Sequence, residues 1–395
     1  MTPEQDLLFA LLQSYINMKE PDMVSDKIEW EELYTLAEQQ SLSGICYLQI
    51  QKLYSKGVSI PEDVIGDFHK AFHSEIYYAV NRESMMIKLQ EAFTKQNIPS
   101  VPFKGWIVKD TWLDPFLRTM GDLDILIHTE DRAKTDQILL SFGFKRFVDN
   151  HAVWTYTDRD LMIEIHDHMF YENLSNQIDY RAYFDQAWDY LASPLWDSYH
   201  FIYLIAHMAK HTINKGVGLR AYMDLVFYSL NSQISWEWIF EELEKLKLKE
   251  YALKCFAFCK TWFHVEWPFE VPQINSSFIH EVTGKIFRDG TFGLDNPENE
   301  GAWYAKEIKR KDKIYGLTAM NLVVSRLFPP YEDMQLIPWY SFVDGRHWLL
   351  PFAWVYRWIY CLINKREHGI RIITKPYVKK DIILQRQNYL SKWGL

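Results

Sequence analysis

Residues 118–127 read Arg-Thr-Met-Gly-Asp-Leu-Asp-Ile-Leu-Ile, which places two carboxylates one residue apart at the start of an apolar, β-prone run. A strand alternates its faces, so the apolar side chains point into a core while Asp122 and Asp124 project together from the other face. Two carboxylates on one face can bind a divalent cation. Charged residues can also keep the edge of a sheet from pairing with another chain, and that alternative stays open here.

A second segment repeats the arrangement. Residues 161–166 read Leu-Met-Ile-Glu-Ile-His, so that Met162, Glu164 and His166 share the face opposite the apolar residues. Glu164 is therefore a candidate third carboxylate. Three acidic groups that face one another repel unless a cation lies between them, and Mg²⁺ with nucleotide phosphates is the usual occupant of such a site. The two segments together indicate phosphoryl or nucleotidyl transfer.

The composition narrows the class of protein. A chain of 395 residues with a net charge of −9 can bury a large core, and it does not offer the broad basic surface that binds a nucleic-acid backbone. A local basic groove is still compatible with this charge, but small-molecule or protein substrates are favoured. The four cysteines are scattered, and the N-terminus lacks the basic region and cleavage site of a secretory signal. We therefore expect a cytoplasmic protein.

The most apolar stretch runs from Trp348 to Ile363. Pro351 and Arg357 interrupt it, and it falls short of the roughly twenty residues that span a bilayer, so no transmembrane segment is predicted and a buried helix is expected. The alternative is a peripheral membrane contact, because aromatic residues precede a basic tail. The aromatic residues are Trp348, Trp354, Tyr356, Trp358 and Tyr360, and the basic ones are Lys365, Arg366, Arg371, Lys375, Lys379 and Lys380.

Periodicity divides the chain into three parts. Helical patterns run to about residue 96, with a long final helix over 61–96, and resume after residue 193 over 194–215, 218–232, 236–246 and 249–265. Between them, strand patterns at 98–103, 144–148, 152–157 and 161–166 accompany the Asp122 strand and helices over 106–112 and 130–142. A turn-rich break is expected over 289–301, with helices resuming to Leu327. We predict an α+β fold, with a small mixed β-sheet core (97–190) embedded between an N-terminal (1–96) and a C-terminal (191–395) helical region.

Two basic positions lie next to the acidic strand. Lys104 and Gly105 stand where a strand gives way to a helix, a turn that can bind phosphate, although a tight turn with a solvated lysine explains the same pair. Arg118 could bind a triphosphate or a carboxylate in bidentate fashion, or form an ordinary surface ion pair.

Further polar residues are candidates for a substrate pocket. His166 shares a face with Glu164 and could touch the substrate or orient the metal ligands, whereas His168 is expected to be structural. His207 and His211 lie one helical turn apart, and Arg220 and Asp224 are spaced alike on the next helix. These pairs could form the metal site of a phosphohydrolase. A substrate pocket, or a link between the helices, is favoured because no third close carboxylate completes a metal-binding set.

Five segments taken together carry a resemblance to a known family. They are Val101–Gly105, Asp114–Arg118, Gly121–Ile127, Gly143-Phe144 and Ile163–His166. They resemble the uncharacterised bacterial nucleotidyltransferase-like family of the DNA polymerase beta superfamily. The resemblance implies that Asp122 and Asp124 bind Mg²⁺ (or Mn²⁺) and nucleotide phosphates, that Glu164 completes the metal-binding triad and activates an acceptor hydroxyl, and that Lys104 and Gly105 form the phosphate-binding turn. The chain departs from the superfamily in having Gly-Trp where Gly-Ser or Gly-Gly is usual, with a longer gap to the first aspartate.

The expected activity is transfer of a nucleoside monophosphate from a nucleoside triphosphate (NTP) to an unknown hydroxyl-bearing small molecule or protein. Two cations would neutralise the triphosphate, and one of them would also lower the proton affinity of the acceptor oxygen. The rival hypothesis is a catalytically inactive binding or regulatory protein. It would keep the sheet but use its pocket, or its aromatic and basic C-terminal end, for a partner or a membrane surface.

Overall fold

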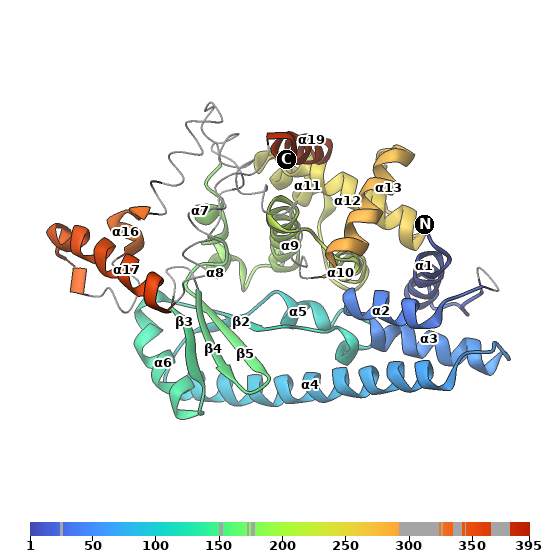
Figure 1. Cartoon of the computed structure of the whole chain (residues 1–395), viewed down its shortest axis with the longest axis horizontal. Helices are drawn as coiled ribbons and strands as arrows, with labels where there is room; N and C mark the ends of the chain where they lie inside the picture. The colour runs from blue at the N-terminus through green and yellow to red at the C-terminus, as the bar shows by residue number, and fades with distance from the viewer. Residues whose placement is uncertain are drawn as a thin grey trace.

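The fold is α+β, as predicted, with a small five-stranded mixed sheet between two helical regions (Figure 1). The computed structural model describes residues 1–23, 27–149, 153–171, 174, 178–291, 324, 327–334, 342, 343, 345–364 and 380–395.

The N-terminal region consists of helices, as expected. They are α1 (Pro3–Ile16), α2 (Trp30–Gln39), α3 (Ser43–Ser55) and α4 (Glu62–Lys95). A capping box starts α1: the Thr2 hydroxyl accepts from the backbone N–H of Gln5, and the Gln5 side chain accepts from that of Thr2. The long helix α4 runs along one side of the molecule, beneath the sheet and beneath α2 and α3 (Figure 1). Its buried residues Met86, Leu89 and Phe93 belong to the same core as one face of the sheet.

The sheet brings the two acidic segments together. Its strands are β1 (Ser100–Pro102), β2 (Leu123–Ile127), β3 (Lys145–Asp149), β4 (Val153–Asp158) and β5 (Leu161–His166), in the order β1-β2-β5-β4-β3. Within it, β2 and β5 form the parallel pair, and the other neighbours are antiparallel. The short helices around it are α5 (Gly105–Lys109), η1 (Pro115–Leu117), η2 (Thr129–Asp131) and α6 (Arg132–Ser141). Leu123, Ile125 and Ile127 pack in the core between the sheet and α4, so the predicted alternation of faces is confirmed.

The other face of the sheet lies against the C-terminal helices. These are α7 (Tyr180–Phe184), α8 (Ala187–Tyr190), α9 (Trp196–Asn214), α10 (Leu219–Asn231), α11 (Trp236–Lys245), α12 (Lys249–Phe263), α13 (Ser276–Asp289) and α19 (Lys380–Trp393). The four helices predicted between 194 and 265 correspond to α9–α12. Phe103 and Leu126 of the sheet region share one apolar core with the helices of both regions. A common core therefore crosses the predicted boundaries at residues 96 and 190, and the division into these three regions stays a prediction.

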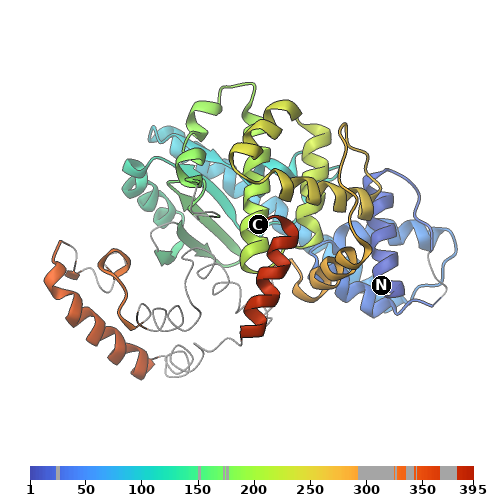
Figure 2. The same ribbon diagram turned by 90° about the horizontal axis from the view of Figure 1, so that it is seen from above.

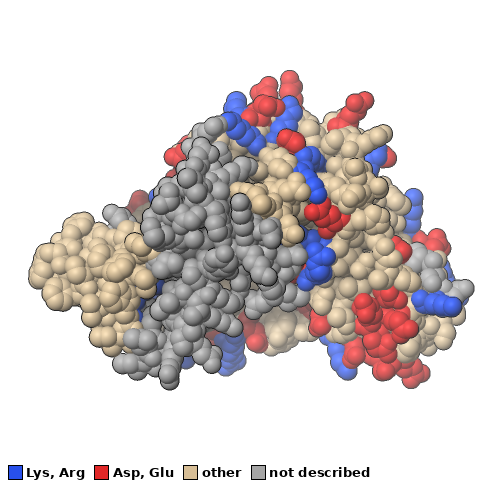
Figure 3. Space-filling view, turned by 45° about the horizontal axis from the view of Figure 1, so that its top comes forward, with Lys and Arg blue, Asp and Glu red and all other residues tan. Residues whose placement is uncertain are grey.

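The predicted apolar helix exists, but its predicted burial is wrong. Helix α17 (Leu350–Asn364) follows α16 (Tyr331–Met334) and η4 (His347–Leu349), and it stands apart from the other described helices (Figure 2). Trp348 and Phe352 are 71% and 64% exposed, whereas Ala353 packs against Met334 and Val343. This unit shows no charged side chain on the face seen in Figure 3. The run has the apolarity of a core helix, yet few described neighbours cover it.

Some predictions fall on residues that the structure does not describe. Among the described residues, no helix combines the length and apolarity needed to cross a bilayer. The basic residues between 365 and 379 lie outside the described residues. So do most of the break predicted over 289–301 and most of the helices predicted up to Leu327. Contact with a membrane surface stays a prediction.

Candidate active site

Two carboxylates face each other across the parallel strands. Asp124 of β2 and Glu164 of β5 are register partners, and His166 follows on the same face of β5. Ligand atoms of these three residues all lie within 4.8 Å of one another. His166 Nε2 lies 2.8 Å from Asp124 Oδ1 and 3.5 Å from Glu164 Oε2. The structure thus brings Asp124, Glu164 and His166 together on one face of the sheet.

Lys104 enters this cluster from the turn between β1 and α5. Its Nζ donates to Asp124 Oδ1. Its backbone has φ 51° and ψ −125°, a conformation that residues other than glycine rarely adopt. The backbone N–H of Lys104 donates to Nε2 of the buried His200 at 3.2 Å, and the Trp106 N–H donates to the Phe103 carbonyl at 3.3 Å to close the turn. These contacts aim the ammonium at the carboxylates.

Gly105 makes room for Arg118. A Cβ at this position would lie 2.3 Å from Arg118 Nη1 and 2.9 Å from Met120 Cγ, so a larger residue would displace both side chains. Gly105 has an ordinary φ, and close packing explains the glycine. Phosphate binding by the Lys104–Gly105 turn stays a prediction.

Charge interactions set the protonation of the cluster. Burial alone would raise the pKa of Asp124, but the Lys104 ammonium and the hydrogen bond from His166 outweigh it and lower that pKa to about 2. Burial works against the charge of Lys104 as well, and the neighbouring carboxylates, led by Asp124, raise its pKa. Asp124 and Lys104 are therefore an ionised buried pair.

Asp122 lies beside the compact group without joining it. Among the described residues, no group of three or more potential metal ligands within 4.8 Å of one another includes Asp122. Burial, together with repulsion from Asp124, raises the pKa of Asp122 to about 6. The residue is thus close enough to feel the cluster. The compact group contains His166 where the sequence analysis expected Asp122. Metal binding by Asp122 stays a prediction.

Aromatic and imidazole side chains of helix α9 line the side of the site opposite the sheet. The Phe103 ring contacts both His166 and Tyr203, with centroids 5.1 and 5.5 Å apart. Further along α9, Tyr203 stacks on His207 at 5.8 Å, and His207 contacts His211 at 4.4 Å. The sequence analysis identified the last two but missed Tyr203 and His200. Tyr203 and His200 lie four and seven residues before His207, and this spacing is the signal that would have placed all four on one helix face.

His207 and His211 of α9 are neutral. Burial, reinforced by nearby cations that include Lys104 and Lys210, lowers the pKa of His211 to about 3 and that of His207 well below its ordinary value. Their Nε2 atoms lie 3.2 Å apart. Among the described residues, neither belongs to a metal-binding group of three. The geometry therefore does not support the phosphohydrolase metal site, and the substrate pocket stays a prediction.

Arg118 and Asp224 form a buried bidentate pair. Arg118 Nε donates to Oδ1 at 3.1 Å and Nη2 to Oδ2 at 2.7 Å, while Trp112 Nε1 adds a bond to Oδ1 at 2.9 Å. Arg220 donates to the carbonyl and hydroxyl of Thr119 at 2.9 and 2.8 Å. Of the contacts considered for Arg118, the bidentate contact with a carboxylate is thus the one observed. Contact of Arg118 with a triphosphate would require this pair to open, and it stays a prediction.

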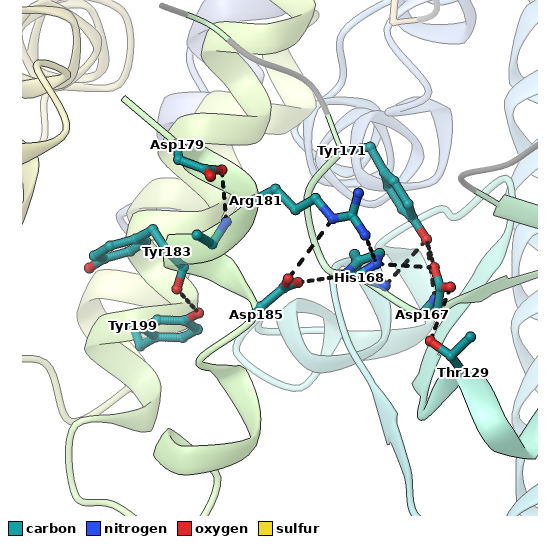
Figure 4. Close-up of polar contacts among 10 residues, drawn as sticks. Thr129, Asp167, His168, Tyr171, Asp179, Arg181, Tyr183, Asp185 and Tyr199 are labelled. Carbon is teal, nitrogen blue, oxygen red and sulfur yellow. Dashed lines mark hydrogen bonds and ion pairs between the residues drawn. The ribbon is translucent and has the colours of Figure 1, made fainter. Parts of the chain in front are cut away.

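His168 has a different environment from His166. Figure 4 shows it between Asp185 and Arg181 of the α7 region, with Tyr171 alongside. His168 Nδ1 lies 2.7 Å from Asp185 Oδ1, Arg181 contacts its Nε2, and the Tyr171 hydroxyl donates to Asp167. These bonds tie the end of β5 to α7, in line with the structural role expected for His168.

A family model described as an uncharacterised nucleotidyltransferase matches residues 26–264, which include the whole sheet and helices α9 and α10. The chain belongs to this family. The resemblance inferred from the sequence motifs is thereby confirmed. No curated protein and no solved structure matches the chain.

The donor set can accommodate a divalent cation. Nucleotidyltransferases use Mg²⁺ or Mn²⁺, and carboxylate oxygens such as those of Asp124 and Glu164 are the ligands that Mg²⁺ prefers. A metal-bound histidine usually donates its second ring nitrogen to a partner, whereas Nδ1 of His166 is buried with no partner among the described residues. His166 therefore fits a role as hydrogen-bond donor to Asp124 better than a role as metal ligand.

Proposed function

We propose that this chain is a metal-dependent nucleotidyltransferase that transfers a nucleoside monophosphate from an NTP to a hydroxyl-bearing acceptor. The observation that carries the proposal is the register pairing of Asp124 with Glu164, on the sheet face that lies against α9, in a member of a nucleotidyltransferase family. Burying these carboxylates and the Lys104 ammonium together costs desolvation free energy, and such clusters of charged groups are typical of active sites.

The proposed metal ligands are Asp124, Glu164 and Asp122. Mg²⁺ or Mn²⁺ bound there would withdraw negative charge from the phosphates and stabilise the charge that develops during transfer. Asp124 is ready for this role because its low pKa keeps it ionised at neutral pH. Lys104 supplies a fixed positive charge on the same face, and the Lys104–Gly105 turn is the proposed contact for the phosphates.

Glu164 is the proposed base for the acceptor. Its side chain is 23% exposed, against 3% for Asp124, so an incoming hydroxyl can reach it more easily. The acceptor oxygen forms a bond to the α-phosphorus as the bond from that phosphorus to the bridging oxygen breaks. The proton of the hydroxyl passes to Glu164, and pyrophosphate leaves. His166, 3.5 Å from Glu164, helps to orient the carboxylate.

The wall opposite the sheet would form the substrate pocket. Tyr203, His207 and His211 of α9 offer ring faces and neutral imidazoles, which can stack on a base or hydrogen-bond to an acceptor. Arg220 lies near enough to His211 to affect its pKa and adds positive charge at the same wall. The Arg118–Asp224 pair would hold α10 in place behind it.

Transfer from α-labelled ATP, CTP, GTP or UTP into cell extract, with Mg²⁺ present, tests this proposal. We expect the wild-type protein to label an acceptor and Glu164→Gln to slow labelling at least about 100-fold, the usual contribution of a general base. Glu91→Gln, at an exposed position on α4, is the matched control and should leave labelling unchanged.

Absence of labelling with all four nucleotides, or labelling that survives both Glu164→Gln and Asp124→Ala, would contradict the transferase proposal. Thermal shift then separates the rival hypothesis. A catalytically inactive nucleotide-binding protein would still be stabilised by NTP with Mg²⁺, whereas a protein that binds another partner would not.

A further inference from the structure

The oxygen Asp124 Oδ1 already has two partners from the protein. It accepts from Lys104 Nζ and lies 2.8 Å from His166 Nε2. Among the described residues, Asp124 Oδ2 has no hydrogen-bond partner. The central carboxylate thus offers one oxygen to the ammonium and leaves the other for a metal ion.

The backbone around Lys104 sets the position of its ammonium. Lys104 has a backbone conformation rarely adopted by residues with a Cβ, and its N–H is fixed to the buried His200. Its side chain is only 16% exposed. An exposed lysine would be free to leave its partner, whereas this one is directed at Asp124 by the turn that carries it.

Two-metal transfer sites hold their ions about 3.5–4 Å apart, and a shared carboxylate commonly bridges them. Asp124 is the buried carboxylate at the centre of this site, so it is the candidate bridge. We propose that the Lys104 ammonium takes the place of one of the two cations, so that the site binds a single divalent ion with each nucleotide. This inference rests on the proposed function and replaces the two cations expected from the sequence.

The charges of the protein side chains agree with a single ion. The carboxylates Asp122, Asp124 and Glu164 carry three negative charges when ionised, and the Lys104 ammonium already offsets one of them, so one divalent cation balances the remaining two before the triphosphate adds its own charge. A second divalent ion would have to approach the Lys104 ammonium in a buried setting, where repulsion is strong. With a single ion, activation of the acceptor hydroxyl falls to Glu164 acting as a base.

The test is the ratio of Mn²⁺ to nucleotide bound to the full chain. The protein is equilibrated with Mn²⁺ and the α,β-methylene analogue of ATP, CTP, GTP or UTP, and both are counted after ultrafiltration. Electron paramagnetic resonance then distinguishes an isolated Mn²⁺ from a coupled pair. We expect one uncoupled Mn²⁺ per nucleotide in the wild type. We expect two coupled ions in Lys104→Gln, because this variant removes the ammonium from its position beside Asp124.

Two variants guard against loss of folding and nonspecific charge effects. Lys104→Arg keeps the positive charge and should keep one ion, and so should Lys134→Gln, which removes an exposed lysine. Two ions per nucleotide in the wild type would overturn the inference while leaving the transferase proposal intact. One ion in both the wild type and Lys104→Gln would also overturn it. Nucleotide binding without Mn²⁺, or no binding, would overturn both proposals.

Discussion

Asp124 and Glu164 occupy the same register position on the parallel strands β2 and β5, so the backbone of the sheet fixes how their carboxylates meet. A parallel pair keeps side chains of register partners on one face, and no loop has to close for the pair to form. Lys104 pairs with Asp124 and offsets one of the two negative charges in place. The site is therefore preorganised, and its parts can be tested separately.

The ion pair of Asp124 with Lys104 is expected to be essential to stability as well as to function. Asp124→Ala leaves a buried ammonium without a partner and should lower the free energy of unfolding by about 3–5 kcal/mol. The double variant Asp124→Ala/Lys104→Met should recover most of this loss, because the ammonium that the single variant leaves without its partner is then absent. Urea denaturation followed by circular dichroism measures both. Losses that simply add in the double variant would show that the two side chains do not interact.

The contributions of Arg118 and Asp224 to the free energy of unfolding should also depend on each other, as those of Asp124 and Lys104 do. Lysine cannot reproduce two parallel bonds to a carboxylate, so Arg118→Lys should destabilise the protein by about 2–4 kcal/mol. Arg159→Lys, at an exposed position, is the matched control and should change stability by less than about 0.5 kcal/mol. A double-mutant cycle with Asp224→Asn measures the coupling. A coupling energy near zero would exclude the bidentate pair as a stabilising contact.

Glu75 on α4 should make stability depend on pH. Burial raises its pKa from 4.5 to about 8, although the backbone N–H of Gly44 and the charge of Arg220 act against this shift. Between these pH values the folded state holds a proton that the unfolded state has lost, so the stability contributed by this group falls as pH rises from about 4.5 to about 8. Glu75→Gln has no proton to lose. Its melting temperature should match that of the wild type near pH 4.5 and exceed it increasingly towards pH 8.

The control for this comparison is Glu91→Gln, which changes an exposed glutamate on the same helix. The difference in melting temperature between Glu91→Gln and the wild type should not vary over the same pH range. If the difference in melting temperature between Glu75→Gln and the wild type were constant from pH 4.5 to 8, the raised pKa of Glu75 would be wrong.

The exposed face of α17 carries the prediction of a membrane contact. Phe352 and Ile359 of α17, with Trp348 of the preceding η4, present apolar surface, and aromatic side chains favour the interface of a bilayer. We expect the full chain to sediment with vesicles of anionic lipid, and Trp348→Ser/Phe352→Ser to reduce the bound fraction several-fold. Leu230→Ser, at an exposed apolar position on α10, should not. Equal sedimentation with and without vesicles would remove membrane binding as a role for α17.

Local patterns in the sequence predicted much of the site, and long-range contacts account for what they missed. Alternation along each strand shows that Asp124 and Glu164 leave the apolar face, because that property depends only on neighbouring residues. It does not show that the two strands are adjacent and in register. The contact of Arg118 with Asp224 joins residues 106 positions apart, and that of Lys104 with His200 joins residues 96 positions apart. Neither follows from spacing within one element.

The α17 helix illustrates the same limit. Its apolar run predicts a helix correctly, since helix formation depends on local sequence. Burial depends on what packs against the helix, and a run of apolar residues carries no information about that partner. Gly105 is a further case, because its need for a small residue comes from Arg118 and Met120, which reach it from another part of the chain.

The central claim is that Asp124 and Glu164 hold the metal ion used for nucleotide transfer. The most direct test is anomalous scattering from crystals of the full chain soaked with Mn²⁺ and a nonhydrolysable NTP. The account predicts an anomalous peak within about 2.3 Å of oxygens of both carboxylates, with the triphosphate beside it. Bound nucleotide with no peak between Asp124 and Glu164, or with Mn²⁺ held only elsewhere, would contradict it.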